Sequence, residues 1–288
     1  FLLSDQDSHG HNVYQESTIQ TLKTFCQDID VLITAGPFLP ALVLDAIPEE
    51  LPLWLDWPSD PLADQHAKRL VTQDDLSDES IVQEIVRAAL FRADAIGVIS
   101  ERQRWASLGQ LLLLGLEESP IYLCPIAYDF PFPAQRQEAK GQDILLSGSL
   151  NTWLDLERIT EILCLDPNIK LHCTGGVTSN FPEATIQLDD IQRRFPSQIQ
   201  HYGWLEEQEL RQVIAQCKYA TWLDRGTIEP LLGSRTRALF SIWNGLRIFG
   251  SAKTELAAFL VSQNAMIAWN PDQNTSSVLE KTSDIDIK

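Results

Sequence analysis

The chain has 288 residues, about twice the ~100–200 that are usual for one domain, so we expect two domains. A hydrophobic fraction of 44%, with 8 Trp and 11 Phe, suffices for two cores, while 14 Gly and 15 Pro exclude a collagen-like or linker-like chain. Forty acidic residues against 22 basic ones give a net charge of -18, which repels phosphate backbones and anionic lipid surfaces. General binding to nucleic acid or to a membrane surface is therefore disfavoured.

Cysteine usage and hydropathy favour a cytoplasmic protein. Five cysteines form no CxxC pair, which indicates reduced, buried thiols rather than disulfides or a zinc site (Cys26, Cys124, Cys164, Cys173 and Cys217). The longest apolar run, Leu111 to Leu116, is too short for a transmembrane segment. Phe1 is not an initiator methionine and no signal peptide follows, so we expect the sequence to begin inside a longer protein.

The first half of the chain alternates apolar runs with helical periodicity. We expect strands over 30–36, 51–56 and 95–100, a helix over 77–92, and a further helix from Ser100 with Trp105, Leu108 and Leu112 on one face. The pattern breaks between Leu123 and Gln142. This predicts an α/β domain over 1–130, incomplete at its N-terminus, and a linker over 131–142.

The second half, 143–288, restarts the βαβα pattern and predicts a six-stranded doubly wound α/β domain. Strands are expected over 144–147, 169–173, 199–202, 219–223, 247–249 and 265–269. Helices are expected over 154–165, 184–194, 206–217, 234–244 and 254–261.

Two segments of this half follow strands and could hold an anion. Gly148 and Ser149 come directly after the first strand, where backbone N–H groups could meet a phosphate, although the spacing is not GxGxxG. The segment 227–237 combines Glu229 with hydroxyls and guanidinium groups, a set suited to a diphosphate (Ser234, Arg235, Thr236 and Arg237). The alternative for Arg235 and Arg237 is surface ion pairing.

Three other positions carry weaker signals. His201 to Leu205 end a strand, and Trp204 could contact a base ring or pack in the core. Asp56, with Asp60 and His66 beyond it, could be a general base or a turn-forming residue. His9 and His11 lack further metal ligands, and His172 has the surroundings of a hydrogen-bonded core histidine.

The series GSLNTWLDLERI, LHCTGG, IQHYGWLEEQELRQVIAQCKYATWL, IEPLLGSRTRALFSIWNGLRIFGS and TELAAFL resembles the donor-binding domain of GT-B-fold glycosyltransferases. It covers roughly residues 143–270, and the segment from Glu229 to Ser234 is its most specific piece. DVLITAGPFLP, LPLWLDWPSD and AIGVISERQRWASLG resemble the acceptor domain less specifically.

The resemblance implies two Rossmann-like domains facing a cleft and a place for each site residue. Gly148 and Ser149 would lie near the donor diphosphate, and Tyr202, Gly203 and Trp204 near the base. Glu229 would lie near sugar or ribose hydroxyls, with Ser234, Arg235 and Thr236 at the phosphates. Retaining members often carry two glutamates eight positions apart, whereas Arg237 stands at that spacing from Glu229 here.

The leading interpretation is transfer of a sugar from a nucleotide-diphosphate sugar to an acceptor hydroxyl, with Asp56 and Glu229 as catalytic candidates. No cofactor and no metal are expected, because helix N-termini and arginines would carry the leaving-group charge. The acceptor, whether a saccharide, a lipid-linked molecule or a protein, stays open. A nucleotide-sugar epimerase or hydrolase and a non-catalytic nucleotide- or sugar-binding module remain as alternatives.

Overall fold

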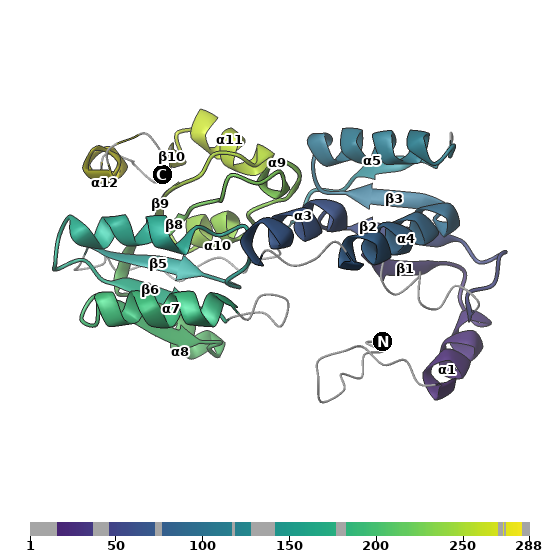
Figure 1. Cartoon of the computed structure of the whole chain (residues 1–288), viewed down its shortest axis with the longest axis horizontal. Helices are drawn as coiled ribbons and strands as arrows, with labels where there is room; N and C mark the ends of the chain where they lie inside the picture. Colours follow the sequence, from purple (N-terminus) through teal and green to yellow (C-terminus); the bar gives the residue numbers. More distant parts are fainter. Residues whose placement is uncertain are drawn as a thin grey trace. The chain divides into compact units, whose positions relative to one another are not determined.

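The computed structural model describes residues 16–36, 46–72, 77–116, 119–127, 142–176, 183–269, 273 and 275–283. The chain divides into two compact units, one made of residues 1–66 and 74–125 and the other of 67–73 and 126–288. In Figure 1 the first sheet is coloured purple to blue and the second teal to yellow. The predicted linker 131–142 lies outside the described residues except for Gln142, so that boundary stays a prediction.

A four-stranded parallel sheet in the order β1-β2-β3-β4 organises the first unit. Its strands are β1 (Leu32–Ala35), β2 (Leu53–Trp57), β3 (Ala95–Val98) and β4 (Ile121–Leu123). The helices of this half of the chain are α1 (Glu16–Cys26), α3 (Pro61–Thr72), α4 (Ser77–Arg92) and α5 (Glu101–Leu113). Ser100 caps α5, because its side chain accepts a hydrogen bond from the backbone N–H of Gln103 at 3.1 Å.

The three strands predicted in this half and the helix over 77–92 are confirmed. Strand β4 was not predicted, because three residues are too few to show a periodicity. The predicted apolar face of α5 is solvent-exposed, with Trp105 67% and Leu112 60% exposed. Helix α5 instead buries Gln103, Ser107 and Leu111, and the Gln103 amide donates to the backbone oxygen of Trp57 at 3.0 Å.

The second unit is built on a six-stranded parallel sheet in the order β7-β6-β5-β8-β9-β10. Its strands are β5 (Asp143–Ser147), β6 (Leu171–Thr174), β7 (Ile199–Gly203), β8 (Cys217–Trp222), β9 (Arg247–Gly250) and β10 (Met266–Ala268). Counted along the chain this is the order 3-2-1-4-5-6 of dinucleotide-binding folds. The direction of winding reverses between β5 and β8.

The helices of this half are α6 (Leu156–Ile159), the 3-10 helix η2 (Thr160–Cys164), α7 (Glu183–Arg194), α8 (Glu207–Ile214), α9 (Glu229–Leu232), α10 (Arg237–Trp243), α11 (Glu255–Ser262) and α12 (Thr275–Ser283). The predicted six strands are confirmed. Two helix predictions need correction: 154–165 is an α-helical turn followed by η2, and 234–244 contains only α10. Helix α9 precedes it, and residues 233–236 separate the two helices.

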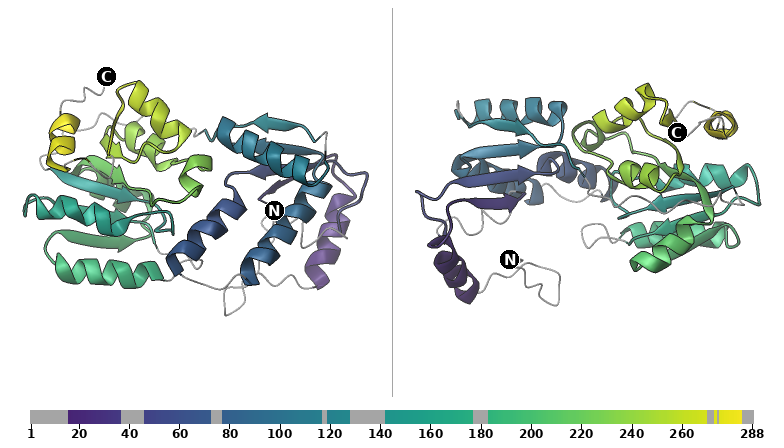
Figure 2. Two further views of the ribbon diagram at one scale, coloured as in Figure 1. Left: turned by 45° about the horizontal axis from the view of Figure 1, so that its top comes forward. Right: turned by 180° about the vertical axis from the view of Figure 1, so that it is seen from behind.

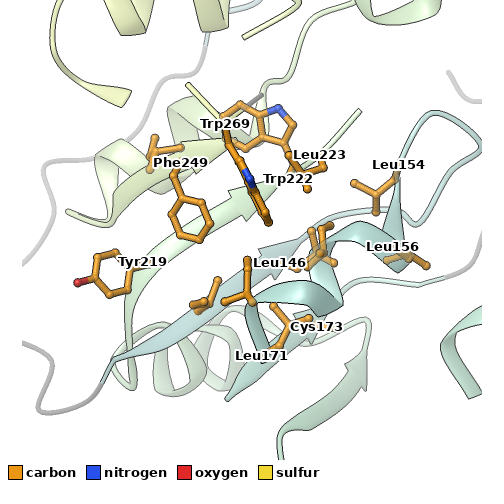
Figure 3. Close-up of a cluster of buried hydrophobic side chains, with 14 of the residues drawn as sticks. Leu146, Leu154, Leu156, Leu171, Cys173, Tyr219, Trp222, Leu223, Phe249 and Trp269 are labelled. Atoms are coloured by element: carbon orange, nitrogen blue, oxygen red, sulfur yellow. The ribbon is translucent and has the colours of Figure 1, made fainter. Parts of the chain in front are cut away.

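Both faces of the second sheet are buried, as is usual for parallel sheets. Ile144 and Leu146 join a large cluster with α6, η2, α7, α11 and α12, while Leu145 packs on the other face with α8 and α10. Figure 2 shows helices on both sides of this sheet, and Figure 3 shows the larger cluster, with Tyr219, Phe249 and Trp269 among its aromatic side chains. This packing fixes the strand ends that carry the candidate site.

The five cysteines are unbridged, but they are not all buried as predicted. Cys164 is exposed at the end of η2, and Cys124 is half-buried. Burial raises the pKa of Cys173 to about 12. Within the described ranges, no helix is long and apolar enough to cross a lipid bilayer.

Candidate functional site

The candidate site lies where the winding of the second sheet reverses. Gly148 follows the carboxyl end of β5, and Asp224 follows that of β8, the neighbouring strand. Open α/β sheets bind their ligands outside the carboxyl ends of the strands at this switch point. The predicted segment 148–149 directly follows β5, and the segment 229–237, which runs from α9 to the start of α10, comes after β8.

Glycines shape the loop after β5. Gly148 has φ +93°, in the left-handed region that favours glycine, and its N–H donates to the Thr174 oxygen at 2.9 Å. Gly175, at φ +97°, approaches the Gly148 carbonyl so closely that a Cβ atom would collide with it. The loops after β5 and β6 are thereby held against each other.

Arg237 lies over this glycine loop. A Cβ at Gly148 would be 3.5 Å from Arg237 Nη2, and the same nitrogen donates to the Ser149 carbonyl oxygen at 3.1 Å. Arg237 Nη1 is buried and has no hydrogen-bond partner among the described residues. Burial, reinforced by the positive charge of Arg235, lowers the pKa of Arg237 to about 10. The side chain is thus still cationic at neutral pH, with a donor available next to the loop.

Arg235, unlike Arg237, is surrounded by negatively charged side chains. It is 4% exposed; its Nε donates to Asp224 Oδ1 at 2.8 Å, and its Nη1 and Nη2 donate to the two Glu229 oxygens at 3.0 and 2.5 Å. Trp153 packs against its guanidinium, 5.2 Å from the ring centroid. Burial alone would lower the pKa of Arg235, but the Asp224 charge and the Glu229 hydrogen bonds outweigh it and raise that pKa.

These contacts exclude the surface ion pair considered for Arg235. The ion pair is buried rather than a surface pair, since Glu229 and Asp224 are 3% and 7% exposed. All three guanidinium nitrogens donate to carboxylates, and the predicted phosphate contact of Arg235 stays a prediction. Both Glu229 oxygens accept hydrogen bonds from Arg235, and the predicted contact of Glu229 with sugar or ribose hydroxyls stays a prediction.

Gly233 allows this pairing between α9 and α10. A Cβ there would be 2.5 Å from Glu229 Oε1 and 3.3 Å from Arg235 Nη1. Ser234 and Thr236 are half-buried, and Thr236 occupies the N-cap of α10 without a side-chain capping bond. Their hydroxyls therefore lie in the same segment as Arg237.

Tyr202 and Trp204, both predicted to lie near the nucleotide base, differ in burial: the Tyr202 hydroxyl is inside the fold and Trp204 is on the surface. The Tyr202 hydroxyl lies 2.7 Å from His172 Nδ1, and the two rings stack with centroids 5.8 Å apart. His172 is 1% exposed and its Nε2 lies 3.0 Å from Asp143 Oδ2, which confirms it as a hydrogen-bonded core histidine. Tyr202 thus points its hydroxyl into the fold.

Trp204 is 71% exposed just beyond β7, after Gly203 at φ +70°. A Cβ at Gly176 would be 2.5 Å from Trp204 Nε1, so the indole lies directly against the backbone at the end of β6. The indole is therefore on the surface rather than in the core, at the same carboxyl edge of the sheet as Gly148.

The remaining predicted positions belong to the first half of the chain. Asp56 lies near the carboxyl end of β2, and its backbone oxygen accepts a hydrogen bond from the Gly36 N–H at 2.7 Å. Asp60 caps α3, because its Oδ1 accepts from the N–H groups of Leu62 and Ala63. The general-base role of Asp56 stays a prediction, and His9 and His11 lie outside the described residues.

Sequence reasoning missed Asp224, Trp153, Gly175 and Gly176. Asp224 had a usable signal, since it directly follows the predicted strand 219–223. The other three act through contacts between loops distant in sequence, which no local pattern encodes. Across the described part of the chain, no group of three or more His, Cys, Asp and Glu residues could hold a metal ion.

No protein-family model and no curated protein matches the chain. Solved structures match it in fold. A sucrose-phosphate synthase from Thermosynechococcus elongatus has a TM-score of 0.65 at 14% identity, over 97% of this chain and 72% of that one. Anabaena HepE, solved with UDP-glucose, has a TM-score of 0.61 at 14% identity, over 93% of this chain and 72% of that one.

The chain has a GT-B glycosyltransferase fold. TarM from S. aureus shares it, with a TM-score of 0.63 at 11% identity, over 92% of this chain. The chain spans about half of TarM, 51% of its length. Likeness at these identities establishes the GT-B fold, with one parallel sheet in each unit.

Proposed function

We propose that the chain is part of a glycosyltransferase that takes its sugar from a nucleotide-diphosphate donor, bound by the second unit. The observation that carries this proposal is Arg237, whose Nη1 is buried without a described partner beside the left-handed Gly148. A diphosphate oxygen would supply the missing acceptor, and charge-assisted bonds of this kind are strong. The GT-B fold and the HepE structures with UDP-glucose and with UDP support a donor of this class.

We assign the phosphate contact to Arg237 with Gly148 and Ser149, and the nearby hydroxyls of Ser234 and Thr236 would complete it. Arg235 and Glu229 hold the 229–237 segment in place through their ion pair and do not contact the phosphate directly. The exposed indole of Trp204 offers a stacking surface for the base. Asp56 remains the candidate general base for the acceptor.

Calorimetric titration of the whole chain with UDP, GDP, ADP and dTDP tests the donor site. We expect one of these to bind, and Arg237→Gln to weaken it about tenfold or more, because a charge-assisted hydrogen bond contributes about 1.5–3 kcal/mol. Arg87→Gln is the matched control: it removes the same charge from an exposed pair with Glu84 on α4. Unchanged nucleotide affinity in a folded Arg237→Gln variant would refute the assignment.

We also propose that donor binding needs no divalent metal, since Arg237 supplies the compensating charge. Repeating the titration with a chelator should leave the affinity unchanged. A loss of about tenfold that magnesium or manganese restores would show that a metal carries the charge instead.

One observation favours a second candidate, a nucleotide-binding module without turnover. Both carboxylates of the 224–237 segment, Asp224 and Glu229, are buried in the pair with Arg235. Incubation with the nucleotide sugar that binds distinguishes the two functions. Nucleotide release that depends on an added acceptor supports the transferase, while stable binding with no release under any acceptor supports the module.

A further inference from the structure

His201 lies near the carboxyl end of β7, and its half-buried imidazole contacts the loop that follows β6. Its Nε2 lies 3.0 Å from the backbone oxygen of Gly175. A carbonyl oxygen can only accept a hydrogen bond, so Nε2 carries the hydrogen and donates it. The pairing of β6 with β7 shifts by one residue between Cys173 and Thr174, just before this contact. The side chain therefore ties β7 to the loop after β6 where the regular strand pairing ends.

Two hydrogen bonds from β7 hold Gly175. Its N–H donates to the Gly203 oxygen at 2.7 Å, and its own oxygen accepts from His201. The N–H and the C=O of one residue belong to the two peptide units on either side of it, and each unit is planar. Gly175 lies beyond the end of β6 at φ +97°, so these two bonds take the place of strand pairing. Together they fix the orientation of both peptide units.

Gly175 in turn packs against the phosphate loop, residues 148–149. A Cβ on Gly175 would collide with the Gly148 oxygen, so only glycine fits beside that carbonyl group. The C=O and the following N–H of a trans peptide unit point in opposite directions. Because the Gly148 oxygen faces Gly175, the Ser149 N–H points away from it. A displaced Gly175 would let this peptide unit turn, and with it an N–H that can donate to a phosphate.

We propose that His201 is a positioning residue for the phosphate loop, a role that rests on the donor site proposed for this loop and Arg237. His201 does not contact the diphosphate. Its bond to Gly175 keeps the Gly148 carbonyl turned toward Gly175 and the Ser149 N–H turned the other way. A loop held in its binding conformation before the ligand arrives loses less conformational entropy on binding, so the affinity is higher.

Four variants separate this role from a general effect on folding. His201→Leu removes the donor, and His201→Phe removes it while keeping a ring of similar shape. His201→Gln keeps an N–H donor at the end of the side chain and should restore the bond. Gln198→Leu is the matched control, because Gln198 Nε2 donates to three backbone oxygens between Leu163 and Ile169, at the amino end of the same strand.

The experiment is calorimetric titration of the whole chain with UDP, GDP, ADP and dTDP, and with inorganic pyrophosphate. We expect His201→Leu and His201→Phe to weaken the nucleotide that binds by about three- to tenfold, the loss that follows from one neutral hydrogen bond. His201→Gln should bind it within about twofold of the parent. Gln198→Leu should lower the melting temperature and leave the affinity unchanged.

Pyrophosphate locates the effect, because it contains the diphosphate without the base. His201→Leu and Arg237→Gln should both weaken pyrophosphate, whereas Trp204→Ala should weaken only the nucleotide. A loss in His201→Leu that is confined to the nucleotide would place the effect at the base and overturn the proposal.

Two further results would overturn it. The first is a nucleotide affinity of folded His201→Leu and His201→Phe that equals the parent's. The second is a loss in His201→Gln or in Gln198→Leu as large as that in His201→Leu. Failure of the donor assignment has a different signature, namely that no nucleotide binds or that its affinity is insensitive to Arg237→Gln. Thermal melting of each variant establishes that it is folded before its titration is interpreted.

Discussion

Arg235 and Arg237 are two residues apart in the chain, yet their guanidinium groups have opposite electrostatic surroundings. Arg235 makes hydrogen bonds to two buried carboxylates, while Arg237 makes one to the carbonyl of Ser149 and has an unpartnered buried nitrogen. The pKa of the first is raised and that of the second is lowered. Of these two cations, one is neutralised by buried carboxylates and the other keeps an unpartnered buried nitrogen, which is why we propose only the second as a phosphate contact.

The strongest test of this contrast is Arg235→Met. It leaves Asp224 and Glu229 buried without their counter-charge, and breaking a buried pair in this way costs about 3–5 kcal/mol. Urea denaturation followed by circular dichroism measures the free energy of unfolding. Arg211→Met, which breaks the exposed pair with Glu207 on α8, should change it by less than about 1 kcal/mol. Equal effects of the two substitutions would contradict the contrast.

Gly233→Ala tests whether the ion pair needs the room that glycine gives it. The new Cβ would be 2.5 Å from Glu229 Oε1, which must then move away from Arg235. We expect a loss of about 1–3 kcal/mol in the free energy of unfolding, as for other overpacked buried sites. Gly226→Ala adds the same atom in open space and should change stability by less than about 0.5 kcal/mol. Similar losses at both glycines would argue against a tight fit around Glu229.

Arg237→Met should have the smallest effect on stability, and in the opposite direction. Arg237 Nη1 is buried and has no hydrogen-bond partner among the described residues, and burying such a group costs free energy. Its removal should therefore leave the free energy of unfolding unchanged or raise it by up to about 1 kcal/mol. The same denaturation experiment at pH 7 measures this change. A loss above about 1 kcal/mol would mean that Arg237 stabilises the fold and is not reserved for a ligand.

The pH dependence sharpens this last comparison. Because the folded-state pKa of Arg237 is lowered to about 10, the folded chain holds this proton less tightly than the unfolded chain does. The cost of burying the charge is therefore fully present below pH 10 and declines as the pH rises above it. Any stability advantage of Arg237→Met should shrink above pH 10, which denaturation at pH 8 and at pH 10.5 measures. An advantage that is the same at both pH values would exclude this cause.

The amino-acid sequence by itself determined the fold class and the strands of the second sheet. Strands such as Ile144–Ser147 are short apolar runs between helical periods, and burial of both faces of a parallel sheet makes such runs continuous. These apolar runs also predicted that Gly148 and the segment 229–237 come after the ends of strands. The apolar pattern failed for β4, which has three residues, and for the exposed face of α5, because periodicity shows an apolar stripe without showing what covers it.

Only the tertiary structure decided what the polar residues at those strand ends do. Asp224 and Glu229 reach Arg235 from different elements, and Trp153 reaches it from the loop before α6. The local sequence offers Arg235 and Arg237 identical chemistry. Which guanidinium is neutralised depends on how the backbone between Asp224 and Arg235 folds back on itself at Gly233, and the spacing of these residues along the chain does not show that path.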